Sequence, residues 1–119
     1  MDIIGVVIAL TALAAAGGAV LRHLAGGQLN SDEFPLGTLA VNLAASFLLG
    51  VIVSADDPLP TVVGIGALGA LSTWSTVANE AAEMARTGRA ALGLTYLGLT
   101  VSSGVLIAWF GLQLGQLIF

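Results

Sequence analysis

Hydroxyl side chains crowd one short segment of the sequence. Ser72, Thr73, Ser75 and Thr76 flank Trp74, and four hydroxyls within five residues exceed what helix packing requires. Each hydroxyl can donate one hydrogen bond, and the edge of an indole ring is electropositive. These groups could replace the water around a small anion. Backbone carbonyls freed in the same segment would instead suit a hard cation such as Na⁺.

Two further polar residues stand beside long apolar stretches. Asn42 lies inside the apolar run from Gly37 to Phe47, where its NH₂ group offers two donors to an anion. A hydrogen bond between helices would satisfy the same amide, so both interpretations stay open. Arg22 follows the first apolar stretch. It would either raise the anion concentration at a pore mouth or extend to the lipid headgroups.

A polar stripe and one carboxylate complete the candidates. Tyr96, Thr100 and Ser103 recur at spacings of four and three, so they share one face of a helix. That face would be an ion track, or its hydroxyls would bond back to their own helix. Glu80 is expected near the end of a helix, where it would be in contact with solvent, cap a neighbour or pair with Arg86, and the first of these is favoured.

The elements that position these residues follow from the composition. Only 8% of the 119 residues are charged, against about 25% in soluble domains. Charges divide the chain into four apolar stretches, each near the ~20 residues that cross a bilayer as helix. We therefore predict a multi-pass, all-α protein of the cell membrane, in contact with lipid. Its single domain, residues 1–119, should contain transmembrane helices at residues 3–21, 36–54, 61–84 and 91–111.

The third predicted helix should be broken near its middle. Gly64, Gly66 and Gly69 precede the hydroxyl segment, and freed backbone groups at membrane depth are tolerated where protein, an ion or water satisfies them. In the first helix, Gly17 and Gly18 should let another helix approach closely.

Several classes of function are excluded. The chain has no cysteine and one histidine, His23, which argues against thiolate or histidine-based metal sites. No residues remain for a soluble domain and no nucleotide motif is present, so we expect neither an enzyme nor a nucleic-acid partner. Arg22, Arg86 and Arg89 follow the first and third helices, and the positive-inside rule places both loops in the cytoplasm.

Four segments together make the sequence resemble the Fluc/CrcB fluoride channels over essentially its full length. They are Gly17-Gly18-Ala19-Val20-Leu21-Arg22, Gly37-Thr38-Leu39 with Val41-Asn42 and Ser46-Phe47, Gly69 to Thr76 with Glu80, and Tyr96. The resemblance implies an antiparallel dimer of the dual-topology type, with two pores, a structural Na⁺ on the dimer axis and passive efflux of cytoplasmic fluoride.

The resemblance also implies roles for individual residues. Gly69 and Ser72 would bind Na⁺ through their backbone carbonyls. The fluoride pore would be lined by residues of all four helices, with Arg22 in its vestibule: Asn42, Trp74, Ser75, Thr76, Tyr96 and Thr100.

The sequence departs from the family at a pair of pore-lining phenylalanines, where it has Trp74 and Val77. Because some family members pair two different chains, the expectation is either a homodimer or a heterodimer with a homologous subunit. Two rival functions remain. A small multidrug-type exporter needs a carboxylate at membrane depth, which residues 3–21 lack. A non-transporting helical subunit would explain the small-residue packing but not Asn42 or the hydroxyl segment.

Overall fold

The chain folds into helices joined by short connections. The structure, a computed structural model, describes residues 2–31, 34–72 and 74–119, apart from the side chain of Leu29. In chain order the helices are α1 (Ile3–Leu29), α2 (Leu36–Ile52), η1 (Pro60–Leu68), α3 (Gly69–Leu71), α4 (Trp74–Arg86) and α5 (Ala90–Ile118). The described residues contain no strand, which confirms the prediction of an all-α protein.

Several of these helices are suited to a membrane. Within the described residues, three helical stretches are long and apolar enough to cross a bilayer: Ile3–Gln28, Pro60–Arg86 and Ala90–Ile118. Many large apolar side chains are exposed along them, including Ile4, Leu94 and Leu117. An apolar exterior of this kind is stable in contact with the hydrocarbon core of a bilayer. The prediction of a multi-pass membrane protein is confirmed.

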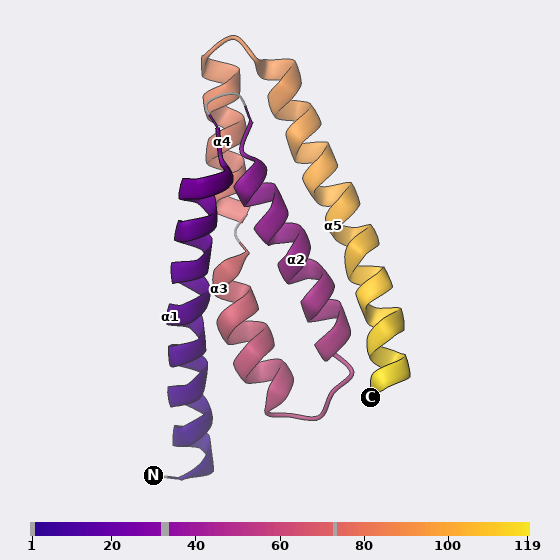
Figure 1. Cartoon of the computed structure of the whole chain (residues 1–119). Helices are drawn as coiled ribbons and strands as arrows, with labels where there is room; N and C mark the ends of the chain where they lie inside the picture. The colour runs from indigo at the N-terminus through magenta and orange to yellow at the C-terminus, as the bar shows by residue number, and fades with distance from the viewer. Residues whose placement is uncertain (1, 32–33, 73) are drawn as a thin grey trace.

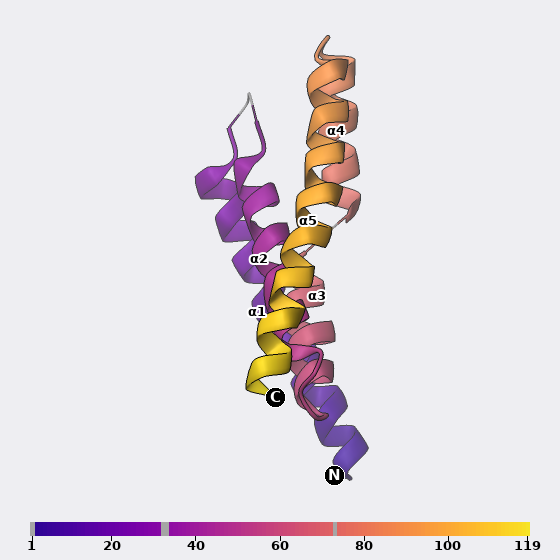
Figure 2. The ribbon, with the colours of Figure 1, turned by 90° about the vertical axis from the view of Figure 1, so that its right-hand side faces the viewer.

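The helices form a bundle that opens at one end. α1 packs along η1 and α3, and α2 packs along α5. Both chain termini lie at the same end of the bundle in Figure 1, and the α1–α2 and α4–α5 connections lie toward the other end. There the bundle divides into two arms, one made by α1 and α2 and the other by α4 and α5 (Figure 2). The α1–α2 and α4–α5 connections thus lie toward the same end, as predicted, although Arg22 itself lies within α1.

The first helix is longer than predicted. α1 continues past Leu21 to Leu29, and only then does Asn30 adopt extended backbone, with its N–H bonded to the Gly26 carbonyl at 3.2 Å. Hydropathy marks where the apolar stretch ends, whereas a helix continues through polar residues that can keep its backbone bonds. The connection to α2 is therefore shorter than the predicted helix ends imply and comprises residues 30–35, of which Asp32 and Glu33 lie outside the described residues. α5 likewise passes its predicted end at residue 111.

The predicted interruption is present in the third apolar stretch. η1 is a π-helix that leads into the single turn of α3. Ser72 then leaves helical geometry, with φ −80° and ψ 150°, and α4 begins at Trp74. Thr73, one of the four hydroxyl residues, lies outside the described part of the chain. The break therefore separates α3 from α4 beside the hydroxyl segment.

Close packing of α1 on η1 depends on a missing side chain. A Cβ atom at Gly18 would lie 2.1 Å from the carbonyl oxygen of Ala67, whereas one at Gly17 would meet nothing within 4 Å. The prediction that this small-residue pair admits a neighbouring helix is thus confirmed at Gly18.

A small apolar core lies between α2, α4 and α5. It contains Leu39, Val77, Ala81, Met84 and Tyr96. Val77, which occupies the position of one of the family's pore-lining phenylalanines, is 0% exposed. Its side chain therefore packs inside the subunit. The core fixes α4 against α5 and so positions the polar groups around the helix break.

Candidate functional site

A cavity lies where the helix break faces α2 and α5. We call it the central cavity; its volume is about 270 Å³, and its lining residues are Asn42, Ser46, Ser72, Trp74, Thr100, Val101, Gly104 and Val105. It therefore brings together four of the residues singled out from sequence, from three separate helices and the break.

Those four residues differ in exposure and in bonding. Asn42 and Thr100 are each 8% exposed, whereas Trp74 is 58% exposed. The Thr100 hydroxyl donates to the Tyr96 carbonyl at 2.7 Å, and the Ser103 hydroxyl bonds to the Leu99 carbonyl in the same way. Back-bonding thus engages the hydroxyl hydrogens of Thr100 and Ser103.

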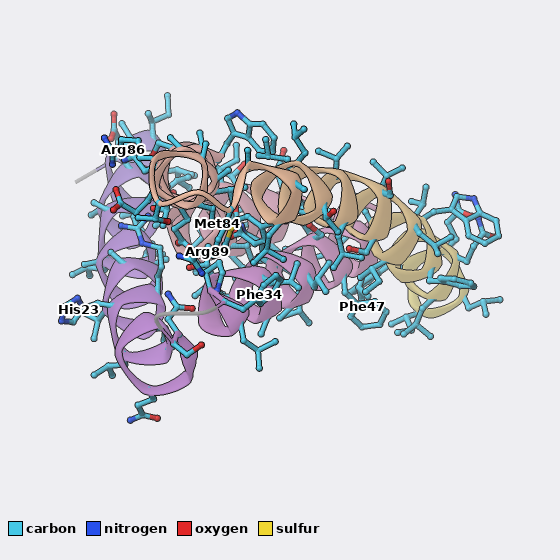
Figure 3. The ribbon with its side chains drawn as sticks, turned by 90° about the horizontal axis from the view of Figure 1, so that it is seen from above. His23, Phe34, Phe47, Met84, Arg86 and Arg89 are labelled. Atoms are coloured by element: carbon cyan, nitrogen blue, oxygen red, sulfur yellow. The ribbon has the colours of Figure 1, made fainter. Side chains whose placement is uncertain are left out.

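Two more cavities lie toward the open end of the bundle. The outer cavity, of about 400 Å³, is lined by Arg22, His23, Gly26, Gly27, Asn30, Thr38 and Thr76. The arm cavity, of about 310 Å³, is lined by Asn30, Ser31, Phe34, Pro35, Glu80, Glu83, Met84 and Arg89. In Figure 3, Phe34, Met84 and Arg89 gather around the arm cavity, and His23 projects away from the bundle.

A hydrogen-bonded chain crosses from α2 to α5 near these cavities. The Thr38 hydroxyl donates to Glu80 Oε1 at 2.6 Å, and the Tyr96 hydroxyl donates to Glu80 Oε2 at 3.4 Å. The Phe34 ring meets the Tyr96 ring edge-on, with centroids 5.4 Å apart. The expectation that Glu80 is simply solvated is wrong, because α4 turns its carboxylate toward two hydroxyl donors.

The remaining predicted residues lie apart from the central cavity. Arg22 and Thr76 share the outer cavity. Tyr96 is 0% exposed and faces Glu80. Ser75 is exposed beside Trp74, and Gly69 is exposed at the start of α3. The candidate pore residues thus form a central group and an outer group, and Tyr96 is buried in the apolar core between α2, α4 and α5.

Sequence reasoning left Asn30, Thr38 and Ser46 out of the site. A signal for two of them was available, because Thr38, Asn42 and Ser46 are four residues apart and lie on one face of α2. Asn30 carried no such signal, since its role depends on contact with a residue eight positions away.

The chemistry of the central cavity favours an anion. In the part of the chain that the structure describes, the polar lining of this cavity consists of an amide, three hydroxyl groups and the indole of Trp74, with no carboxylate. Amide N–H and hydroxyl groups donate hydrogen bonds to an anion without bringing a full negative charge near it. Among the described residues there is also no group of three or more His, Asp or Glu side chains that could hold a metal ion.

Comparison with known proteins identifies relatives over most of the chain. Fluoride-specific ion channel FluC 1 of Geobacillus kaustophilus is 40% identical over 103 residues, which cover 83% of this chain and 89% of the relative. FluC 2 of Corynebacterium diphtheriae is 39% identical over 102 residues, covering 86% and 94% of the two chains. FluC of Shewanella halifaxensis is 40% identical over 118 residues, covering 92% of each chain.

The family comparison agrees with these relatives. Residues 9–112 match the family described as CrcB-like protein, Camphor Resistance (CrcB). The match includes α2, the helix break, α4 and most of α1 and α5, and therefore every residue that lines the central cavity. The chain belongs to the CrcB-like family of membrane proteins.

Proposed function

We propose that the chain is one subunit of a fluoride-selective channel through which fluoride leaves the cytoplasm passively. The observation that carries the proposal is the pairing of relatives named fluoride-specific ion channels with a central cavity lined by neutral hydrogen-bond donors. No covalent step is involved, and the protein is not an enzyme.

The physical task of such a channel is to replace the water that fluoride holds tightly. A narrow path does so when its donors match the lost hydration without holding the ion too strongly. In our proposal, the Asn42 amide, the Ser75 hydroxyl and the edge of Trp74 donate to fluoride. Thr100 and Tyr96 would contribute by exchanging their present bonds, to the Tyr96 carbonyl and to Glu80, for bonds to the ion.

The outer group would act before the ion reaches the central cavity. Arg22 and Thr76 line the outer cavity together, at the end of the bundle where the two arms separate. A cation at that position raises the local concentration of anions by long-range attraction. We propose that Arg22 is the vestibule charge and Thr76 an early donor on the fluoride path.

A second subunit would complete the pore. The central cavity opens on the surface of the single chain, and the half-buried Ser46 and Ser72 line it there. Lipid tails cannot hydrogen-bond to such groups, so at membrane depth another protein surface has to cover them. We propose an antiparallel dimer, formed with a second copy or with a homologous subunit. α2 would be the fourth membrane span of each subunit. Its 17 residues give about 25 Å of helix, which is at the short end of the range that crosses a bilayer.

The helix break is suited to a structural Na⁺ on the dimer axis. α3 ends where Ser72 becomes extended, and the last carbonyl groups of a helix have no partner along it. Carbonyls of broken helices are known Na⁺ ligands in membrane proteins. A Cβ atom at Gly69 would meet only the Gly64 oxygen, at 3.6 Å, so another subunit can approach closely. We propose that the Gly69 and Ser72 carbonyls of both subunits bind this ion, which would hold the dimer together.

Flux from reconstituted vesicles tests the proposed function. Purified protein in vesicles loaded with potassium fluoride should release fluoride to an ion-selective electrode, and chloride-loaded vesicles should stay sealed. Equal release of both anions would overturn the selectivity. If vesicles with this chain, alone and together with a homologous subunit, retained their fluoride, the proposed function would fail.

A further inference from the structure

The side chain of Asn30 holds Thr38 at two points. Its Oδ1 atom accepts from the Thr38 backbone N–H at 3.0 Å, and its Nδ2 group donates to Thr38 Oγ1 at 3.1 Å. Because the backbone N–H can only donate, the amide oxygen must be the atom that faces it. The orientation of the Asn30 carboxamide is therefore determined by its surroundings.

One of these bonds replaces a missing helix cap. Pro35 precedes the first turn of α2 and makes no side-chain capping bond. The N–H groups of a first turn have no partner within the helix, and Asn30 satisfies the one at Thr38 from the end of α1. The two helices also touch here, since a Cβ atom at Gly37 would lie 2.5 Å from the Ala25 carbonyl oxygen.

The other bond determines what the Thr38 hydroxyl does. A threonine hydroxyl has a single hydrogen and can also accept. Asn30 Nδ2 donates to the hydroxyl oxygen, and the hydroxyl hydrogen is donated to Glu80 Oε1 at 2.6 Å. The Asn30 donor thus fixes the rotation of the Thr38 hydroxyl, whose hydrogen points at Glu80 Oε1 from α2, while the Tyr96 hydroxyl donates to Oε2 from α5.

The position of this chain gives it a consequence for an anion. Asn30 lines both the outer cavity and the arm cavity, Thr38 lines the outer cavity, and Glu80 lines the arm cavity. Without the Thr38 donor, the carboxylate would keep only the longer bond from the Tyr96 hydroxyl, at 3.4 Å. More of its negative charge would then act on an anion in the neighbouring cavities, and like charges repel each other.

We infer that Asn30 is a positioning residue for fluoride passage: through Thr38 it keeps Glu80 hydrogen-bonded at the boundary between the outer and arm cavities. This inference rests on the proposed function and adds to it a residue that does not touch the ion.

The variant Asn30→Asp separates the two bonds. Aspartate keeps an oxygen for the Thr38 N–H but loses the NH₂ donor to the hydroxyl. We expect the purified variant to keep the melting temperature of the parent, while fluoride efflux falls about two- to tenfold, as expected for the loss of one hydrogen bond. In a Thr38→Val background, Asn30→Asp should lower efflux no further, because the hydroxyl through which it acts is gone.

Controls distinguish this inference from simpler effects. Asn79→Asp adds the same charge at an exposed position of α4 and should retain parental efflux. Asn30→Ser is the uncharged second variant, and it too should lower efflux only when Thr38 is present. Provided that the parent conducts, two results overturn the inference. Either the Asn30 variants lower efflux as much in the Thr38→Val background as in the parent, or both Asn30 variants show parental efflux. A parent that releases no fluoride overturns the proposed function itself, and the inference with it.

Discussion

Replacing Asn42 by leucine tests the amide at the centre of the proposed path. Asn42 is 8% exposed and lines the central cavity from the middle of α2. Leucine has a similar volume and suits a helix interior, so Asn42→Leu should leave the fold intact. It removes an N–H donor at a place where few water molecules can take over.

The size of the effect follows from the hydrogen bond that the ion would lose. A bond to a charged group contributes about 1.5–3 kcal/mol. If it is made at the barrier, its loss slows passage about 10- to 150-fold. The measurement is the initial rate of fluoride efflux from vesicles, per amount of purified protein, with size-exclusion elution as the check on folding and assembly.

A matched substitution controls for the change in chemistry. Asn79→Leu makes the same replacement at an exposed position on α4 that lines none of the three cavities, and it should conduct like the parent. An efflux rate for Asn42→Leu within twofold of the parent would refute the assignment of this amide to the path.

Two further predictions concern packing and charge. Gly18→Ala should lower the stability of the purified protein by about 1–3 kcal/mol, since its Cβ would strike the backbone of η1. Gly17→Ala should leave the stability unchanged, because a Cβ atom there meets nothing within 4 Å. Equal melting temperatures for the two variants would contradict the close packing at Gly18. Arg22→Gln should slow fluoride efflux at about 0.01 M salt and much less at about 1 M, where screening shortens to about 3 Å. The control is Arg86→Gln, which removes an arginine that pairs with Glu83 on an exposed surface and should conduct like the parent. If the effect of Arg22→Gln did not depend on salt, long-range attraction of fluoride by Arg22 would be refuted.

Much of the architecture was predictable because lipid imposes a simple rule. Charges interrupt the apolar stretches at the helix ends, so the membrane helices could be assigned by length alone. The break at Ser72 was predictable from glycine and hydroxyl residues that crowd the third stretch. The limits of α1 and α5 were not, because hydropathy reports the apolar stretch and not the hydrogen-bonded backbone.

The site was predictable only where local pattern decides it. Asn42 and Trp74 stood out by residue type and indeed share one cavity. The burial of Tyr96 and Val77 and the bonding of Glu80 depend on how α2, α4 and α5 meet, which spacing along one helix does not reveal. Asn30 depends on a contact between two helices, and no pattern in its own neighbourhood distinguishes it.

Both ends of the chain emerge at the same face of the bundle (Figure 1). Reporter tags fused after Phe119 and before Asp2 would therefore sit in one compartment for any given molecule. A protease added outside sealed vesicles would remove both tags or neither from each molecule, and the cleaved fraction would count how many molecules inserted in each orientation.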